Sequence, residues 1–145
     1  MIALASDHAG FSYKEKIKTL LHELGEPYKD FGTHSADSTD YPDWAHLASE
    51  AITRGECDRG ILVCGTGIGM SIVANKHRGV RAAVCESVTA ARLARQHNNA
   101  NVLTVGERIT GWESVADIIR VFLSTDFEGG RHTRRVEKIH SLTTL

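Results

Sequence analysis

Short apolar runs alternate with longer segments of helical periodicity along the whole chain. The runs cover residues 2–5, 28–31, 61–63, 80–84 and 102–105, and 28–31 has the weakest pattern. Most of them lack polar alternation, as strands covered on both faces of a parallel sheet do. Strands separated by helical segments predict an α/β fold with a five-stranded parallel sheet and right-handed crossovers.

The helical segments show apolar residues at intervals of three and four. They run from Ile17 to a stop at Gly25, from Trp44 to Ile52, from Met70 onward, from Ser87 to Asn99 and from Trp112 to Leu123. This spacing predicts amphipathic helices that pack on the sheet. Residues 32–43 are polar and rich in turn formers, which predicts a surface loop. The tail breaks at Gly129 and Gly130, and a helix is predicted over about residues 131–142.

Residues 60–76, GILVCGTGIGMSIVANK, join a buried strand, a glycine-rich turn and a helix start. Gly65, Gly67 and Gly69 stand at alternate positions, so the backbone can turn tightly and approach a ligand closely. Free N–H groups at the start of the helix can bind an anion. Cys64 ends the strand beside them, which would favour its thiolate form as a base or nucleophile.

This stretch also has structural interpretations. The turn could be only a tight connection, and Cys64 could be only a small buried apolar residue. Three known loops do not fit, because the G-x-G-x-G spacing breaks the dinucleotide fingerprint, no G-K-[ST] follows, and Met70 stands where a phosphatase-type loop needs arginine. A loop that holds a small oxyanion near a thiol remains.

Other polar residues follow the first strand and the long loop. Asp7 and His8 stand at the carboxyl end of a predicted parallel strand, where ligands gather. Asp7 could equally cap the next helix. Tyr41 could contact a substrate or only anchor the loop.

Three arginines are candidates for binding an anion. Arg108 follows the fifth strand and is either a ligand or a solvated surface charge. Arg131 and Arg135 are four residues apart, so on a helix they share one face and could grip one anion together, or form a solvated basic face.

Composition narrows the class of protein. A length of 145 residues with 41% hydrophobic residues and two prolines predicts one folded domain over residues 1–145. A net charge of -1 argues against nucleic acid and membrane surfaces as partners. No long apolar segment or leader is evident, so we expect a soluble cytoplasmic protein. Three cysteines without a C-x-x-C pair suit reduced thiols, and without His-x-x-x-His or a carboxylate cluster we expect no metal and no cofactor.

Several short blocks occur in an order that is similar to one family. They are DHAGF at 7–11, TDYP at 39–42, CGTGIG at 64–69, ANK at 74–76, RQHN at 95–98 and EGGRH at 128–132. With these blocks the chain resembles, over nearly its full length, the sugar-phosphate isomerases of the type B ribose-5-phosphate isomerase and galactose-6-phosphate isomerase superfamily.

The resemblance implies a Rossmann-like three-layer α/β/α sandwich. It also implies a homodimer, or a tetramer, with active sites built between subunits and the C-terminal helix reaching the partner. The implied reaction is metal-free interconversion of D-ribose 5-phosphate and D-ribulose 5-phosphate through an enediolate, in the non-oxidative pentose phosphate pathway.

The resemblance further implies roles for single residues. Cys64 corresponds to the base and Thr66 supports the proton transfers, while His97 corresponds to the residue that opens the furanose ring. The implied anion hole comprises Gly65, Thr66, Gly67, Ile68 and Gly69. Asp7 and Asn98 would lie near the sugar hydroxyls and Tyr41 would line the site. The implied phosphate ligands are His8, Arg108, Arg131 and Arg135.

Two departures and two alternatives accompany this resemblance. Met70 stands where one branch has a glutamate base, which favours the cysteine mechanism, and Trp44 stands where tyrosine is common. The substrate could instead be a six-carbon phosphate such as galactose 6-phosphate or allose 6-phosphate. A non-catalytic sensor of a phosphorylated sugar would use the same arginines without needing a thiol.

Overall fold

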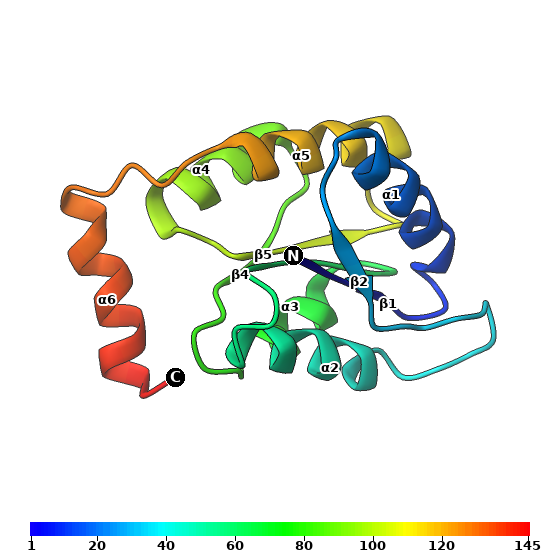
Figure 1. Cartoon of the computed structure of the whole chain (residues 1–145), viewed down its shortest axis with the longest axis horizontal. Helices are drawn as coiled ribbons and strands as arrows, with labels where there is room; N and C mark the ends of the chain where they lie inside the picture. The colour runs from blue at the N-terminus through cyan, green and yellow to red at the C-terminus, as the bar shows by residue number, and fades with distance from the viewer.

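A five-stranded parallel sheet forms the centre of the computed structural model, which describes residues 1–145 (Figure 1). The strands are β1 (Ile2–Ser6), β2 (Tyr28–Asp30), β3 (Arg59–Cys64), β4 (Ala82–Val84) and β5 (Val102–Gly106). Their order in the sheet is β2-β1-β3-β5-β4, and every pairing is parallel. The predicted α/β fold with a five-stranded parallel sheet is confirmed.

Helices cover both faces of the sheet, as a parallel sheet requires. They are α1 (Phe11–Glu23), α2 (Tyr41–Thr53), α3 (Ile68–Ala74), α4 (Val88–Asn98), α5 (Trp112–Ser124) and α6 (Arg131–Thr143). α1, α4 and α5 lie on one face, α2 and α3 lie on the other, and α6 stands at one end of the molecule beside α4 (Figure 1). None of the six combines the length and the apolar character that crossing a bilayer needs.

Side-chain alternation along β3 divides the interior into two cores. Ile61 and Val63 pack with the α1, α4 and α5 side, whereas Leu62 and Cys64 pack with the α2 and α3 side. Successive strand residues point to opposite faces, so the unbroken apolar run serves both cores. The same alternation places the Cys64 side chain on the face of the sheet that α2 and α3 cover.

Element boundaries differ from the sequence prediction in several elements, among them α1, which begins at Phe11 rather than at Ile17. α2 begins at Tyr41, inside the predicted loop, because Pro42 suits the first turn of a helix. α3 begins at Ile68 rather than Met70, since Gly67 already turns the chain at the N-cap. β4 begins at Ala82 rather than Val80, because the Arg81 N–H donates to the Asn101 side chain instead of to a strand.

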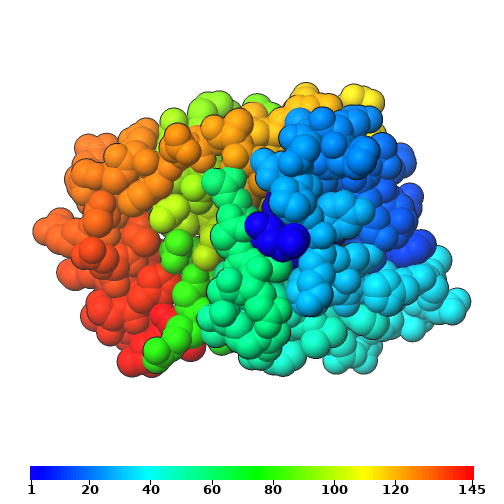
Figure 2. Space-filling view, in the orientation of Figure 1, coloured from blue at the N-terminus to red at the C-terminus, as the bar shows by residue number.

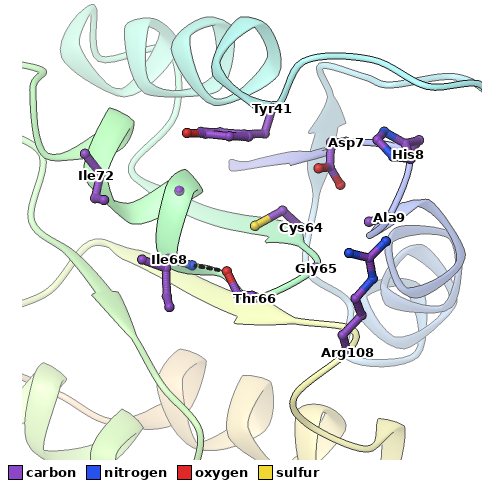
Figure 3. Close-up of a pocket in the computed structure, with 11 residues that line it drawn as sticks. Asp7, His8, Ala9, Tyr41, Cys64, Gly65, Thr66, Ile68, Ile72 and Arg108 are labelled. Carbon is purple, nitrogen blue, oxygen red and sulfur yellow. Dashed lines mark hydrogen bonds between the residues drawn. The ribbon is translucent and has the colours of Figure 1, made fainter.

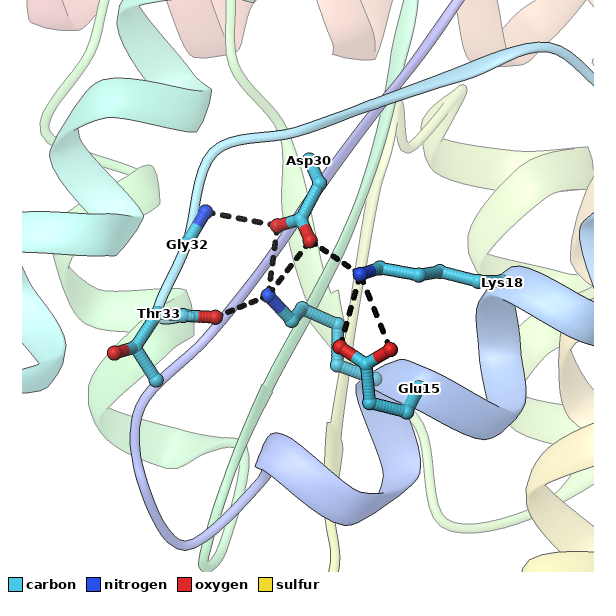
Figure 4. Close-up of polar contacts among 6 residues, drawn as sticks. Glu15, Lys18, Asp30, Gly32 and Thr33 are labelled. Carbon is cyan, nitrogen blue, oxygen red and sulfur yellow. Dashed lines mark hydrogen bonds and ion pairs between the residues drawn. The ribbon is translucent and has the colours of Figure 1, made fainter. Parts of the chain in front are cut away.

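A buried ammonium group ties α1 to β2 and the loop that follows it (Figure 4). Lys14 is fully buried, and its Nζ donates to Asp30 Oδ1 at 2.7 Å, to Asp30 Oδ2 at 2.9 Å and to the Thr33 carbonyl. Asp30 also accepts from the Gly32 N–H at 2.8 Å and pairs with Lys18. The loop leading to Tyr41 is therefore fixed at its origin.

Candidate active site

A cavity of about 430 Å³ opens at the carboxyl ends of β1, β3 and β5. The chain leaves β1 toward one edge of the sheet and β3 toward the other, and open α/β sheets bind ligands at such a point. The lining residues are Asp7, His8, Ala9, Tyr41, Cys64, Gly65, Thr66, Ile68, Gly69, Ile72 and Arg108. Figure 3 shows the Cys64 sulfur and the ends of Asp7 and Arg108 directed toward this space.

Cys64 lies at the base of the cavity, where the glycine loop begins. Its side chain is 5% exposed, and its sulfur accepts a hydrogen bond from the Gly67 N–H at 3.1 Å. The Gly67 amide, in the turn that begins α3, is thus aimed at the Cys64 sulfur. One amide of the glycine loop therefore lies against the thiol, and the helix that follows is only seven residues long.

Two glycines of the loop are required by the space around them. Gly67 has a positive φ of 77°, and a Cβ there would lie 2.9 Å from the backbone of Val105. A Cβ at Gly69 would lie 2.7 Å from the ring of Tyr41. The Tyr41 ring thus packs directly against the loop (Figure 3). Tyr41 is 40% exposed and lines the cavity.

Asp7 and His8 extend from the end of β1 and are held in place by backbone groups. Asp7 Oδ1 accepts from the Gly10 N–H at 3.0 Å, so this carboxylate orders the turn before α1 while it also lines the cavity. His8 Nδ1 lies 3.2 Å from both the amide nitrogen and the carbonyl oxygen of Thr39. Either tautomer of His8 is therefore anchored to the long loop, with Nε2 left for a ligand.

Arg108 supplies a positive charge to the cavity. Its backbone N–H donates to the Gly65 carbonyl at 2.9 Å, which fixes the turn after β5 against the glycine loop. The side chain lies against Gly65, with Nη1 3.3 Å from the position of a Cβ there. Since the guanidinium forms no ion pair within the chain, it is available to an anion.

The other two thiols differ from Cys64 in their surroundings. Cys57 and Cys85 are buried away from the cavity. Burial raises the pKa of Cys85 to about 11, and burial is also the main cause that raises the pKa of Cys57. Both therefore stay protonated near neutral pH. Cys64 is the one cysteine that lines the cavity.

Five predicted site residues do not line this cavity: Gly67 forms the turn behind Cys64, and the other four lie elsewhere in the chain. His97 and Asn98 end α4, and Arg131 and Arg135 begin α6. The His97 ring stacks on buried His132 with centroids 4.4 Å apart. Figure 2 shows the end of α6 beside the segment before β4, and Asn98 lines the separate cavity of about 290 Å³ between them. One chain does not bring these four residues to Cys64.

Some functional candidates were missed by the sequence analysis. Ala9 and Ile72 line the cavity, and Ile72 could have been found because it follows Ile68 by four residues and so shares its helix face. Two groups of possible metal ligands were also not foreseen from the sequence. His46, Glu50 and His77 lie together, and so do His97, Glu128 and His132. In each group one histidine comes from a distant part of the chain, so no short sequence motif records the group. Neither group lines the Cys64 cavity.

Comparisons with known proteins identify relatives of this chain. The family described as Ribose/Galactose Isomerase matches residues 2–139. The ribose-5-phosphate isomerase B of Escherichia coli is 47% identical over 97% of this chain and 95% of its own length. The D-erythrulose-4-phosphate isomerase of Pectobacterium atrosepticum is 42% identical over 95% of this chain and 91% of its own length.

Solved structures show the same architecture. Ribose-5-phosphate isomerase B of Clostridium thermocellum superposes with a TM-score of 0.97 at 48% identity, over 99% of this chain and 97% of that one. Ribose-5-phosphate isomerase B of Mycoplasma genitalium, solved with bound ribulose-5-phosphate, gives a TM-score of 0.95 at 41% identity, over 99% and 95%. The predicted resemblance is confirmed, and the chain belongs to the ribose/galactose isomerase family.

Proposed function

We propose that this protein is an aldose-ketose isomerase that interconverts D-ribose 5-phosphate and D-ribulose 5-phosphate, a step of the non-oxidative pentose phosphate pathway. The observation that carries the proposal is the shared cavity of Cys64 and Arg108, which pairs a proton-transfer group with a free cation for phosphate. The relatives named as ribose-5-phosphate isomerase B, one with bound ribulose-5-phosphate, support the same substrate.

The chemistry requires one base and one anion site. The Cys64 thiolate removes the proton from C2 of the open-chain aldose, and the electron pair forms the C1–C2 double bond of an enediolate. Returning that proton to C1, together with transfer of the O2 hydroxyl proton to O1, gives the ketose with its carbonyl at C2. Preorganised donors aimed at the negative oxygen are worth about 2.7–4 kcal/mol each, and the amides of residues 65–69 are the candidates beside the sulfur. Thr66, whose Oγ accepts from the Ile68 N–H at 3.2 Å, stands where a hydroxyl could relay protons.

A homodimer would complete this site. The proposed ring-opening residue His97, the sugar ligand Asn98 and the phosphate ligands Arg131 and Arg135 lie away from Cys64 in one chain. At the edge of the cavity, Ile68 is 52% exposed and Ile72 is 57% exposed. A second copy that covers these two side chains and extends its α4 and α6 over the cavity would supply the missing groups, which is the arrangement expected from the family resemblance.

Removing the thiol tests the proposed base. We expect Cys64→Ala to lower kcat by about 10²–10⁴-fold, the range for loss of general base catalysis, while binding of ribose 5-phosphate persists. Cys57→Ala is the matched control, because Cys57 is similarly buried but lies outside the cavity. An assay coupled to ribulose 5-phosphate measures both variants. Near-normal turnover of Cys64→Ala would remove the assigned base.

The length of the substrate is tested separately. One relative is named D-erythrulose-4-phosphate isomerase, so a four-carbon sugar phosphate is included as a candidate substrate. The specificity constant kcat/KM is measured for this substrate, for ribose 5-phosphate and for the six-carbon phosphates predicted as alternatives. We expect kcat/KM to be highest for ribose 5-phosphate. A higher value for a four- or six-carbon phosphate would change the substrate but keep the reaction type. Thermal stabilisation by ribose 5-phosphate without any product would instead favour a sensor.

The predicted cytoplasmic location stays a prediction.

A further inference from the structure

Three side chains that bind metals well gather where α2 packs against the end of α3. His46 and Glu50 are one helical turn apart on α2, so they share a face. His77 follows α3 and lies against them, and the candidate ligand atoms of the three residues are all within 4.8 Å of one another. His46 Nδ1 and His77 Nε2 are 2.8 Å apart, and the ring centroids are 5.0 Å apart.

The ring of His77 is oriented by a backbone group. Its Nδ1 lies 3.0 Å from the carbonyl oxygen of Val73, which fixes Nδ1–H as a donor. Its Nε2 then carries a lone pair that points at His46. Metal-ligating histidines have this arrangement, in which one ring nitrogen donates to a carbonyl and the other binds the ion. His77 is therefore preorganised as a ligand.

His46 and Glu50 can adjust to an ion between them. His46 is exposed, and two nitrogens bound to one tetrahedral zinc at 2.0–2.1 Å are about 3.3 Å apart, so its ring needs to move by only about 0.5 Å. Neutral His46 would shift its proton to Nε2. Glu50 Oε2 accepts from Arg54 at 2.9 Å, which leaves Oε1 for the ion.

We propose that His46, Glu50 and His77 form a surface site for a divalent ion of the zinc type. Two imidazoles and one carboxylate with an open fourth position for water are a ligand set that Zn²⁺ accepts. The ion would link α2, which begins at Tyr41, to His77 in the segment that follows α3. The site would thus stabilise the packing on one side of the Cys64 cavity without touching a substrate. The second cluster is a poorer candidate, because its two rings stack face to face and His132 is buried.

Zinc binding to the full-length protein tests the site. After treatment with a chelator and its removal, ZnCl₂ is titrated by calorimetry into the wild-type chain, His46→Ala and Glu50→Gln. We expect the wild type to bind one ion more per chain than His46→Ala, or to bind it at least tenfold more tightly. Glu50→Gln should bind it with intermediate affinity. Zinc should raise the melting temperature of the wild type more than that of either variant, because an ion that binds only the folded state stabilises it.

A control variant and a second metal distinguish this site from nonspecific binding. His22→Ala removes an exposed histidine outside both clusters and should bind zinc as the wild type does. Co²⁺ should give the visible absorption of a tetrahedral complex in the wild type and lose it in His46→Ala. Equal zinc affinity and stoichiometry in the wild type and His46→Ala, or no binding by the wild type, would overturn the proposal. Both outcomes are independent of isomerase activity.

Discussion

Gly67 determines the geometry of the loop at the scale of one residue. It combines a positive φ with an amide that donates to the Cys64 sulfur and with backbone of Val105 directly behind it. A side chain would meet both the strain of the left-handed region and the neighbouring strand. The position of one hydrogen atom beside the proposed base therefore depends on the absence of one Cβ.

Gly67→Ala should lower both stability and activity. The left-handed conformation costs an alanine about 1–2 kcal/mol, and the contact with Val105 adds to that cost. A shift of about 1 Å at the donor can lower turnover by about 10²-fold. Urea unfolding and kcat/KM on ribose 5-phosphate measure the two effects.

Gly55→Ala provides the matched control. Gly55 has a similar φ of 74°, but no atom lies within 4 Å of the position of its Cβ. This variant should lose only the stability that the strained φ costs, and its turnover should equal that of the wild type. Equal kcat/KM in Gly67→Ala and Gly55→Ala would show that the loop does not need its present geometry.

At the scale of elements, the pair of Lys14 and Asp30 joins α1 to β2. Burial alone would raise the pKa of Asp30, but hydrogen bonds from Lys14, Lys18 and the Gly32 amide outweigh burial and lower it below 3.8. The charged form of Asp30 is therefore stabilised in the folded protein. Because Lys14 is fully buried, its ammonium depends on this one carboxylate for charge compensation.

Asp30→Asn should destabilise the protein by about 3–5 kcal/mol, since it leaves a buried ammonium without its counter-ion. Glu15→Gln removes only the exposed pair with Lys18 and should cost at most about 1 kcal/mol. Because folding lowers the pKa of Asp30, its stabilisation is fully present above 3.8 and is lost as the pH falls through the folded value. Urea unfolding of the wild type and Asp30→Asn from about pH 6 down to about pH 3 should show their free energies of unfolding drawing closer as the pH falls. A constant difference would contradict the assigned linkage.

Local periodicity explains why most elements could be predicted from the sequence. The apolar run of β3 and the spacing from Trp112 to Leu123 are properties of neighbouring residues, and the structure confirms both elements. The start of α2 was placed too late because Pro42 and Asp43 are residues that also favour turns. The cluster of His46 and His77 was missed because no sequence spacing records how α2 packs against the end of α3.

At the scale of the whole molecule, the direction of α6 decides which residues meet. Gly129 and Gly130 both have positive φ, at 67° and 56°, and a pair of glycines can turn a chain in many directions. The sequence therefore predicts the helix but not where Arg131 and Arg135 point. α6 packs beside α4 and leaves Ile139 and Leu142 exposed, at 42% and 78%. These two exposed apolar side chains of α6 are candidates for contact with a second copy of the chain.

Mixed dimers test whether two copies share each site. Cys64→Ala and His97→Asn alone should each have little activity on ribose 5-phosphate. In a symmetric dimer whose sites combine Cys64 of one chain with His97 of the other, a heterodimer has one site with both defects and one site with none. Random mixing makes half of the dimers hetero, and half of their sites are intact, so about a quarter of wild-type activity should return. If both residues served a site within one chain, every site would carry one defect and no activity would return. Different affinity tags on the two variants show that heterodimers have formed, and ribulose 5-phosphate formed per chain, relative to the wild type alone, is the measurement.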